Sequence, residues 1–255
     1  CKPREGETVS MVECCVQSIL DKSSYRNFEI LVLDRRQMPA AMEQRFQTQG
    51  VRRVSYDEPF NWSAVNNLGA KQTDAAQLLF LNDDMEVISP GWLESMLEFS
   101  QQPEIGAVGA KLLFPNGRVQ HAGVTIIDGM PGHAFQHFEE SDPGYFGAVA
   151  VHRNCIAVTG ACLMTRSEVF HRLGGFDTAL PLNFNDVDYC LRLIQNGMRV
   201  VYTPHAQLLH YESVSRPRRT EAYEIDELKR RWFARWKEER ERWWLWDGRL
   251  GVRIG

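Results

Sequence analysis

Residues 75–84 read AAQLLFLNDD, a short apolar run that ends in an amide and two carboxylates. An apolar run without polar alternation predicts a strand that is buried on both faces, as in a parallel sheet. A second run of this kind, FEILVLD at residues 28–34, ends in Asp34. Ligands of open α/β sheets bind beyond the carboxyl ends of the strands. These acidic ends are therefore the first place to look for a functional site.

Helical patterns lie between the predicted strands. Val12, Cys15, Val16 and Ile19 share one face of a helix expected over residues 11–21. Capping residues predict three further helix starts, at Ser89, Ser167 and Asn185. Further strands are expected at residues 105–114, 124–127, 155–165 and 199–203, and a long loop at residues 128–150. This alternation predicts an α/β fold with a mostly parallel sheet flanked by helices.

Composition excludes several classes of protein. The 255 residues carry a formal net charge of −4, which argues against a general nucleic-acid binder. No apolar run reaches the length of about 18 residues that a membrane span needs. The first ten residues, CKPREGETVS, lack the apolar segment of a secretory signal. The six cysteines form no Cys-x-x-Cys pair, which favours reduced thiols and a cytoplasmic location over disulfides or a zinc site.

The carboxylates after the run at residues 75–81 suggest a metal site. Asp83 and Asp84 are adjacent, so on an extended chain they point to opposite sides and should have different roles. Oxygen ligands of this type suit Mg²⁺ or Mn²⁺, which often bridge to phosphates. His210 follows an apolar stretch and could reach the same ion, which would favour Mn²⁺. The alternative is a solvated turn that ends a strand.

A second acidic group opens the helix expected at Asn185. Acidic residues in a first turn stabilise the helix dipole, and this is the simpler explanation for Asp186 and Asp188. A carboxylate at a helix N-terminus also stays ionised and can accept a proton from a hydroxyl nucleophile. Because these two residues do not share a helix face, at most one of them is expected to be a general base and the other to support the loop.

Several blocks of the chain resemble the inverting family 2 glycosyltransferases with a GT-A fold. The resemblance is strongest to the bacterial branch that builds O-antigen, capsule and rhamnose-rich polysaccharides. It covers roughly residues 12–216, in order and at family-like spacing. The blocks are FNWSAVNNLGA, LLFLNDDMEVISPGWLESML, GAVGAKLLFPNGRVQHAGV, AVTGACLMTRSEVFHRLGGFD and FNDVDYCLRLIQNGMRVVYTPHAQLLHYESVSR.

This resemblance implies a reaction and its partners. A sugar would pass from a nucleoside diphosphate to an acceptor hydroxyl with inversion at the anomeric carbon, assisted by Mn²⁺ or Mg²⁺. The expected partners are the nucleoside-diphosphate sugar donor and a glycan or lipid-linked acceptor, with no nucleic acid. The expected location is the cytoplasm, at the inner face of the membrane.

The resemblance also implies roles for individual residues. Asp34 matches the aspartate that holds the base or ribose of the nucleotide. Asp84 matches the metal ligand, and Asp83 would face the ribose or the donor sugar. Asp186 matches the catalytic base. His210 matches a late histidine that completes the metal site in related enzymes.

Other residues of the matching blocks are expected to contact the donor. Gly160 and Ala161 match a backbone segment beside the donor sugar. Asn67 belongs to the FNWSAVNNLGA block, which resembles the segment ahead of the metal motif, and is assigned to donor binding. His121 lies in the block QHAGV without an assigned role. Asn185 stands in the place of the glutamate in the family's Glu-Asp motif, whose aspartate matches Asp186.

The N-terminal part departs from the family pattern. Family members open with a buried strand, whereas here Thr8-Val9-Ser10 is followed at once by the predicted helix at Met11. Three explanations remain open, namely a segment left out of the numbering, a truncation, and a divergent protein of weak activity. After Asp34 the chain reads RRQMP in place of the usual family residues, which leaves the nucleotide base undefined.

The C-terminal part is rich in tryptophan and arginine. Five of the seven tryptophans fall in the last 24 residues. Ile225, Leu228 and Trp232 are at helical spacing, which predicts a helical extension at 218–255 after a GT-A domain at 1–217. The extension either docks on the catalytic domain or lies at a membrane surface, where lipid-linked acceptors reside. Glutamates nearly balance the arginines, which favours docking.

Three functions are therefore weighed. The first is a metal-dependent inverting glycosyltransferase of polysaccharide synthesis. The second is a catalytically impaired sugar-nucleotide or glycan-binding domain, joined to further domains of a longer polysaccharide-assembly protein. It is suggested by the missing strand and by Asn82, an asparagine at the first position of a segment that matches the family's Asp-x-Asp-type metal motif. The third is a nucleotidyltransferase, which ranks lowest because no Gly-rich phosphate loop with a basic residue occurs near the N-terminus.

Overall fold

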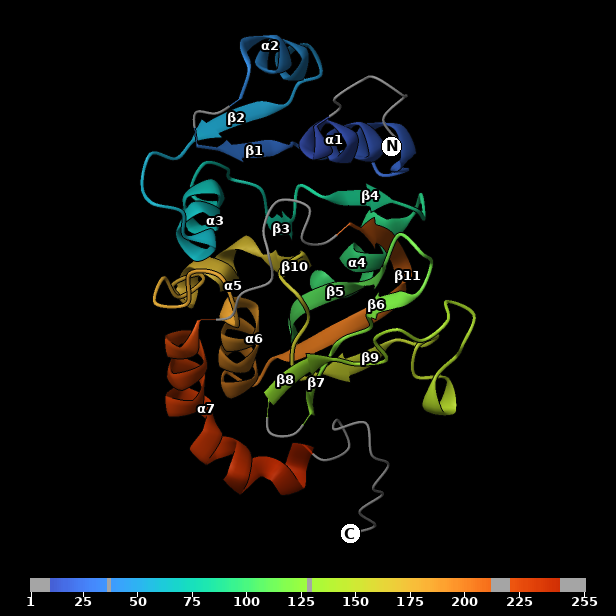
Figure 1. Ribbon diagram of the computed structural model, residues 1–255, viewed down its shortest axis with the longest axis vertical. Helices are drawn as coiled ribbons and strands as arrows, with labels where there is room; N and C mark the ends of the chain where they lie inside the picture. Colours follow the sequence, from blue (N-terminus) through green and yellow to red (C-terminus); the bar gives the residue numbers. More distant parts are fainter. Residues whose placement is uncertain (1–9, 36–37, 128–129, 212–220, 244–255) are drawn as a thin grey trace.

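The computed structural model describes residues 10–35, 38–127, 130–211 and 221–243. Helices and strands alternate along most of the chain (Figure 1). The helices are α1 (Met11–Lys22), α2 (Ala40–Thr48), α3 (Trp62–Ala70), α4 (Trp92–Ser100), the 3-10 helix η1 (Tyr145–Gly147), α5 (Ser167–Arg172), α6 (Asn185–Gln195) and α7 (Ala222–Trp243). The strands are β1 (Leu31–Asp34), β2 (Arg52–Ser55), β3 (Gln77–Leu81), β4 (Met85–Val87), β5 (Ile105–Leu113), β6 (Val119–His121), β7 (Val124–Ile127), β8 (Met130–His133), β9 (Arg153–Cys155), β10 (Cys162–Arg166) and β11 (Arg199–His210).

The main sheet has seven strands. Five of them follow the order β3-β10-β5-β11-β4, while β6 pairs with β5 and β9 with β11. β10 is antiparallel to both of its neighbours, so β3 and β5 run in the same direction, and β11 is parallel to β5. β3, β5 and β11 therefore share one direction, as the sequence predicts, whereas β10 and the edge strand β4 run antiparallel to them.

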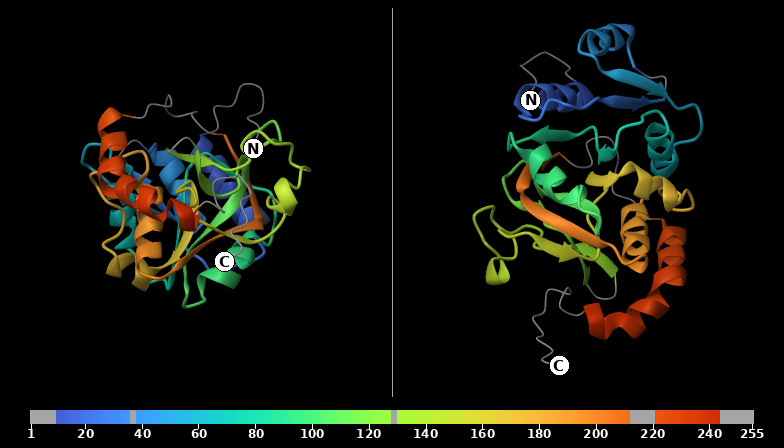
Figure 2. Two further views of the ribbon diagram at one scale, coloured as in Figure 1. Left: turned by 90° about the horizontal axis from the view of Figure 1, so that it is seen from below. Right: turned by 180° about the vertical axis from the view of Figure 1, so that it is seen from behind.

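The sheet has a hydrophobic cluster on each face. β5 is buried along its whole length, and neighbouring residues on it point to opposite sides. Ala107 belongs to the cluster formed with α6, whereas Val108 belongs to the cluster formed with α4. Figure 2 shows the two helices on either side of the sheet. Burial on both faces explains why these strands are apolar without alternation.

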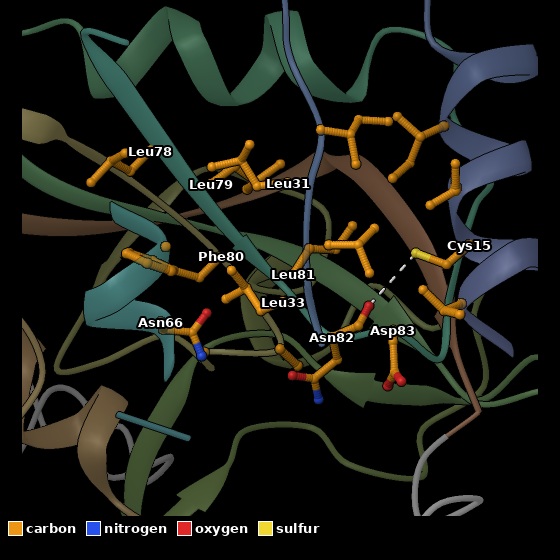
Figure 3. A pocket seen from close by; sticks show the side chains of 18 of the residues that line it. Cys15, Leu31, Leu33, Asn66, Leu78, Leu79, Phe80, Leu81, Asn82 and Asp83 are labelled. Carbon is orange, nitrogen blue, oxygen red and sulfur yellow. Dashed lines mark hydrogen bonds between the residues drawn. The ribbon is translucent and has the colours of Figure 1, made fainter. Parts of the chain in front are cut away.

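β1 and β2 form a parallel pair of their own, apart from the main sheet (Figure 1). In the part of the chain that the structure describes, no strand pairs with the other edge of β1 or with the free edge of β3. A gap thus separates β1 from β3, and leucines of both strands line it (Figure 3). The gap is adjacent to α1, the helix that the sequence places directly after Ser10 without the opening strand of the family.

The helix expected at residues 11–21 is α1, and its ends explain its position. Ser10 and Glu13 form a capping box at its N-terminus. At its C-terminus, Lys22 Nζ donates to Glu86 Oε1 at 2.8 Å, and the Tyr211 hydroxyl donates to Glu86 Oε2 at 2.8 Å. Burial would raise the pKa of Glu86, but these hydrogen bonds and the charge of Lys22 outweigh it and lower the pKa to about 2.

Several predicted boundaries are wrong for local reasons. The strand expected from residue 28 begins at Leu31, where pairing with β2 begins. The helix expected at Ser89 begins at Trp92 after Gly91, because Ser89 Oγ instead accepts a hydrogen bond from the Gln207 backbone at 2.8 Å. Asn185 is the first residue of α6 and not its cap; the cap is Phe184, in the left-handed conformation with φ 61°.

Two longer segments also differ from expectation. The strand expected at residues 155–165 is divided into β9 and β10, and the connection between them carries Gly160. The loop expected at residues 128–150 contains β8, which pairs with β7 as a hairpin, and the helix η1. Among the described helices, none combines the length and the apolar composition that a membrane crossing requires.

Candidate active site

One cavity gathers most of the residues that the sequence predicts to be functional. It has a volume of about 1470 Å³ and extends from the gap beside β1 to the loops before β10 and α6. The predicted site residues that line it are Asp34, Asp83, Asp84, Gly160, Ala161, Asp186 and His210. Figure 3 shows that Asn82 and Asp83 lie at the end of β3, past the leucines of the gap. The cavity is therefore at the carboxyl end of the strand, where α/β folds bind ligands.

Asp84 and His210 face each other at this end of the cavity. Asp84 is 6% exposed and His210 is 8% exposed. Asp84 Oδ1 lies 3.2 Å from His210 Nε2. It nevertheless makes no hydrogen bond within the described residues. A buried carboxylate oxygen without a hydrogen bond is costly unless a cation or a proton compensates it.

This pair fits a divalent cation. A carboxylate and an imidazole are ligands that Mn²⁺ accepts, and such ions usually complete their shell with water and substrate phosphates. The described residues contain no cluster of three or more His, Cys, Asp or Glu side chains around a common point. Asp83 is exposed while Asp84 is buried, so the two carboxylates point to different surroundings, as expected for adjacent residues.

The nearby Cys15 contacts the backbone of the same segment. Its Sγ donates to the Asn82 carbonyl at 3.6 Å, as Figure 3 shows. Burial, together with the nearby Asp83 and Asp84, raises the pKa of this thiol to about 12 against an opposing backbone hydrogen bond. The thiol is therefore protonated in the metal-free site.

Asp186 is held at the N-terminus of α6, facing the cavity. Its Oδ2 accepts a hydrogen bond from the Gly160 backbone at 2.8 Å, and its Oδ1 accepts one from the Val187 backbone at 2.8 Å. These two bonds fix the orientation of the carboxylate. Gly160 is required here, because a Cβ at this position would lie 2.8 Å from the Trp62 ring. Ala161 follows, and its carbonyl accepts from the Asn82 backbone at 3.0 Å.

Asp34 lies at the end of β1 and already has a cationic partner. Arg53 Nη2 lies 2.7 Å from its Oδ2, and the Met38 backbone donates to the same oxygen at 3.3 Å. Arg53 also contacts Glu43. A nucleotide at Asp34 would therefore meet a carboxylate that Arg53 holds in place.

Asn67, which the sequence assigns to donor binding, does not lie in the cavity wall. Its Nδ2 donates to the Phe176 carbonyl at 2.7 Å, and its Oδ1 accepts from the Phe176 backbone at 2.9 Å. Both ends of the amide are used to fix the loop after α5, and Asn67 does not line the cavity, whereas its neighbour Asn66 does. On a helix, adjacent residues point in different directions, and the motif alone did not show which asparagine faces the site.

His121 is part of a buried layer beneath the cavity. Its Nδ1 lies 2.8 Å from Nδ1 of His133, and the Thr159 backbone donates to its Nε2 at 3.4 Å. Burial, with His133, Arg153 and His210 nearby, lowers the pKa of His121 well below its ordinary value. The motif QHAGV therefore supplies neutral polar groups behind the site. Its first residue, Gln120, contacts His210 and was not singled out from the sequence.

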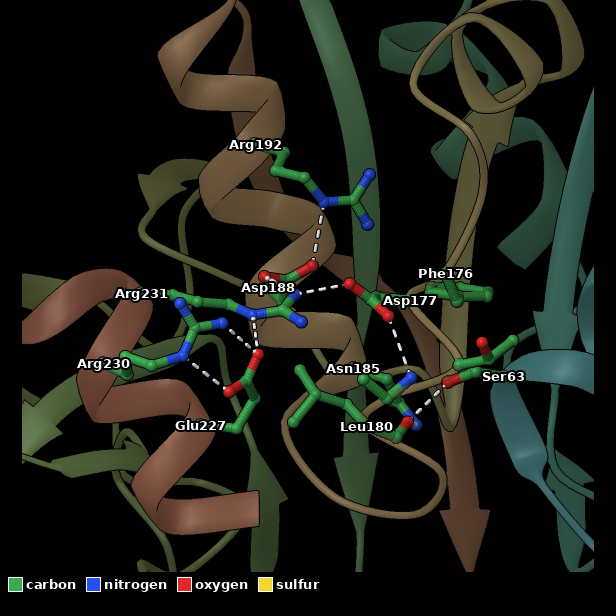
Figure 4. Close-up of polar contacts among 12 residues, drawn as sticks. Ser63, Phe176, Asp177, Leu180, Asn185, Asp188, Arg192, Glu227, Arg230 and Arg231 are labelled. Carbon is green, nitrogen blue, oxygen red and sulfur yellow. Dashed lines mark hydrogen bonds and ion pairs between the residues drawn. The ribbon is translucent and has the colours of Figure 1, made fainter. Parts of the chain in front are cut away.

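Asp188 has a structural role and does not line the cavity. It is 1% exposed. Its Oδ2 accepts from Arg192 Nε at 2.8 Å, as Figure 4 shows. Its Oδ1 accepts from Trp232 Nε1 at 3.0 Å and from Arg231 Nη1 at 3.2 Å. Asp186 and Asp188 thus divide their roles, as their separate helix faces predict. Asp188 joins α6 to α7.

The described part of α7 docks on the rest of the molecule. Leu228 is fully buried and Trp232 is 6% exposed. Glu224 is fully buried as well, and its Oε1 accepts from the backbones of Leu182 and Asn183 at 3.0 and 2.8 Å. This helix therefore holds the loop that leads into α6 and Asp186. Trp236, Trp243, Trp244 and Trp246 lie outside the described side chains.

A comparison with family models identifies the chain. The model described as "Glycosyltransferase like family 2" matches residues 7–243. The chain belongs to this family. Two solved structures show the same GT-A fold. GalNAc-T7 with UDP, GalNAc and Mn²⁺ superimposes with a TM-score of 0.70 at 15% identity, over 91% of this chain and 48% of that one. The mannosyltransferase PcManGT from Pyrobaculum calidifontis, in complex with GDP-Man and Mn²⁺, gives 0.59 at 15% identity, over 86% and 56%.

Two relatives of this family 2 domain are much longer proteins. The O-antigen biosynthesis protein RfbC of Myxococcus xanthus is 44% identical over 81% of this chain, which spans 16% of that protein. The uncharacterized protein y4gI of Sinorhizobium fredii is 39% identical over 88% of this chain, which spans 26% of it. An N-acetylglucosaminyl-diphospho-decaprenol L-rhamnosyltransferase of Mycobacterium tuberculosis is 26% identical over 59% of this chain and 54% of that protein.

Proposed function

We propose that the domain is a metal-dependent inverting glycosyltransferase of bacterial cell-surface polysaccharide synthesis. It would move a sugar from a nucleoside diphosphate to a hydroxyl of a glycan or lipid-linked acceptor. The observation that carries the proposal is that Asp186 and the Asp84–His210 pair line the same cavity. A base and a cation site in one cavity can act on the two ends of a displacement at the sugar.

In the proposed reaction Asp186 acts as the general base. The acceptor oxygen attacks C1 of the sugar from the face opposite the diphosphate. As the new C1–O bond forms, the hydroxyl proton passes to Asp186 and the bond from C1 to the diphosphate oxygen breaks. The electron pair of that bond leaves with the nucleoside diphosphate. One displacement of this kind inverts the anomeric carbon.

The charge on the leaving group needs a counter-charge. Asp84 and His210 would hold Mn²⁺ or Mg²⁺, whose bound form neutralises the diphosphate as its negative charge grows. The oxygen of Asp84 that has no hydrogen bond supports this assignment. Gly160 and Ala161 would lie beside the donor sugar, Asp83 would face the sugar or ribose, and Asp34 would contact the nucleoside.

The wider context is also part of the proposal. The relative involved in O-antigen biosynthesis and the rhamnosyltransferase support a role in polysaccharide assembly. The buried free cysteines fit a reducing compartment, so we place the domain in the cytoplasm, at the inner face of the membrane. The GT-A domain would occupy residues 1–217 and the helical extension residues 218–255, next to further domains of a longer chain.

The test is a substitution at Asp186 with a matched control. Purified protein is incubated with Mn²⁺ and UDP-, GDP- and dTDP-sugars, and release of the nucleoside diphosphate is measured. We expect Asp186→Asn to abolish release for the active donor, while calorimetry shows nucleotide binding largely intact. Asp226→Asn makes the same change at an exposed position of α7 and should have no effect. Full activity of Asp186→Asn would rule out the base assignment.

The gap between β1 and β3 favours a second candidate function, a catalytically impaired sugar-nucleotide or glycan-binding domain. The cavity continues into this gap, so the described residues do not close the walls around a nucleotide on that side. Calorimetry with UDP, GDP and dTDP, with and without Mn²⁺, distinguishes the two functions. Metal-dependent binding together with turnover supports the enzyme. Binding without turnover of any donor supports the second candidate, and no metal-dependent binding counts against the enzyme.

A further inference from the structure

Gln120 is a buried polar residue that makes a direct contact with His210. Its side chain is 2% exposed, and its Oε1 lies 2.7 Å from His210 Nδ1. An amide oxygen can only accept a hydrogen bond, so His210 Nδ1 must carry the hydrogen at this distance. A neutral imidazole with the hydrogen on Nδ1 has a lone pair on Nε2.

The contacts on the other ring nitrogen agree with this tautomer. His210 Nε2 lies 3.4 Å from Asn82 Nδ2, which is a donor group. It lies 3.2 Å from Asp84 Oδ1, yet that oxygen makes no hydrogen bond with any described residue. With the hydrogen on Nδ1, Nε2 accepts from Asn82, and Asp84 Oδ1 lies beside the same nitrogen without a hydrogen bond from it. A nitrogen lone pair and a carboxylate oxygen face one another, which is an arrangement that a cation stabilises.

The backbone around Gln120 explains why its side chain reaches His210. Val119 pairs with Leu113 and His121 pairs with the preceding residue, Leu112. Gln120 is therefore the extra residue of a β-bulge in β6. Bulges redirect a side chain relative to the regular alternation of a strand, and they are frequent beside active sites. All three residues of β6 are buried, so the amide of Gln120 has little freedom to turn away.

We propose that Gln120 is a positioning residue that fixes the tautomer and orientation of His210, so that Nε2 presents its lone pair to a divalent cation shared with Asp84. This inference rests on the proposed function, because it assumes that His210 is a metal ligand. A partner that accepts from the distal N–H of a metal-binding histidine typically changes metal affinity by about 10- to 100-fold when it is removed. Gln120 does not itself contact the reacting atoms.

The tautomer can be measured without metal or substrate. Long-range ¹H–¹⁵N correlation spectra of the metal-free full chain report which nitrogen of each histidine carries the hydrogen, and His210→Ala identifies the signal. We expect the Nδ1–H form in the wild type, loss of that preference in Gln120→Leu, and its recovery in Gln120→Glu, which keeps an acceptor oxygen. Gln101→Leu, at an exposed glutamine, is the control. An Nε2–H form in the wild type, or an unchanged spectrum in Gln120→Leu, overturns the proposal.

Mn²⁺ affinity, measured by electron paramagnetic resonance, gives the second readout. We expect affinity about 10- to 100-fold weaker for Gln120→Leu, but within a few-fold of wild type for Gln120→Glu and Gln101→Leu. Equal affinity in wild type and Gln120→Leu overturns the proposal even if their tautomers differ. If the wild type binds no Mn²⁺, the metal-dependent function fails, and the proposed role of Gln120 in metal binding fails with it. The tautomer spectrum still shows whether Gln120 controls the tautomer of His210. Circular dichroism of each variant identifies any that fails to fold, and Gln120→Glu then decides the comparison.

Discussion

Replacing Asp188 by asparagine should destabilise the fold while leaving the chemistry of the site intact. The carboxylate is 1% exposed and accepts hydrogen bonds from Arg192, Arg231 and Trp232. An asparagine keeps one acceptor oxygen but turns an N–H₂ group toward a guanidinium and removes the negative charge between two arginines. Breaking a buried ion pair from one side costs about 3–5 kcal/mol.

The lower end of that range applies here. Arg192 also donates to the carbonyls of Leu173 and Gly175, and Arg231 also contacts Asp177, so neither guanidinium is left without partners. We therefore expect a loss of about 3 kcal/mol in the free energy of unfolding. For a domain of this size that corresponds to a Tm lower by about 6–12 °C.

The assay is urea unfolding followed by circular dichroism, with Trp232→Phe and the double variant measured in parallel. The double-mutant cycle formed by these variants isolates the bond between the indole N–H of Trp232 and Asp188. We expect a coupling free energy of about 1 kcal/mol for it. Asp186→Asn, two residues away, should lose transfer with a smaller loss of stability, because it gives up one backbone hydrogen bond and no ion pair. A change below about 1 kcal/mol in Asp188→Asn would refute the view that this carboxylate anchors α7.

Three further outcomes are expected. The pKa of Glu86 in the folded state, about 2, lies below its unfolded value. Its contribution to stability is therefore full above about pH 4.5 and is lost as the pH falls toward 2. Urea midpoints measured across this window should fall less with pH in Glu86→Gln than in the wild type. Gly160→Ala should force the Trp62 ring to move, which lowers the free energy of unfolding by about 1–3 kcal/mol and raises the KM for the donor; unchanged kinetics would contradict the close approach. Glu224→Ala removes the oxygen that accepts from two backbone N–H groups, so kcat should fall by more than nucleotide affinity does, while a uniform loss of both would indicate general unfolding.

The elements that the sequence predicted well are those whose pattern is local. The apolar face of α1 and the apolar runs of β3 and β5 reflect burial that recurs along the element, on one face of α1 and on both faces of β5. The predicted helix ends are wrong where a residue far along the chain takes the hydrogen bond of the expected capping group. Ser89 bonds to the backbone of Gln207, far along the chain, so it cannot cap α4, and no local signal shows this.

The charged residues of the site could be predicted from the sequence, but the residues that hold them in place could not. Carboxylates at strand ends and helix starts are visible in the sequence, and the cavity gathers Asp34, Asp84 and Asp186. Gln120 and Glu224 were missed because their roles depend on contacts between elements that are far apart in sequence, namely β6 with β11 and α7 with the loop before α6. The resemblance to the family supplied residue roles, but it did not separate Asn67 from Asn66.

Within the described residues, the gap beside β3 separates two parts that share no continuous hydrogen-bonded ladder. β5 exchanges backbone bonds with strands on both sides and is buried throughout, whereas β1 is bonded on one side and its residues are only half-buried. Local opening of the β1–β2 unit therefore need not break the central sheet. In native-state hydrogen exchange, the amides of β1 and β2 should exchange through low-energy openings, while those of β5 and β11 should require global unfolding. A nucleotide that contacts Asp34 on one side and Asp84 on the other would bridge the two parts and slow exchange in β1 and β2.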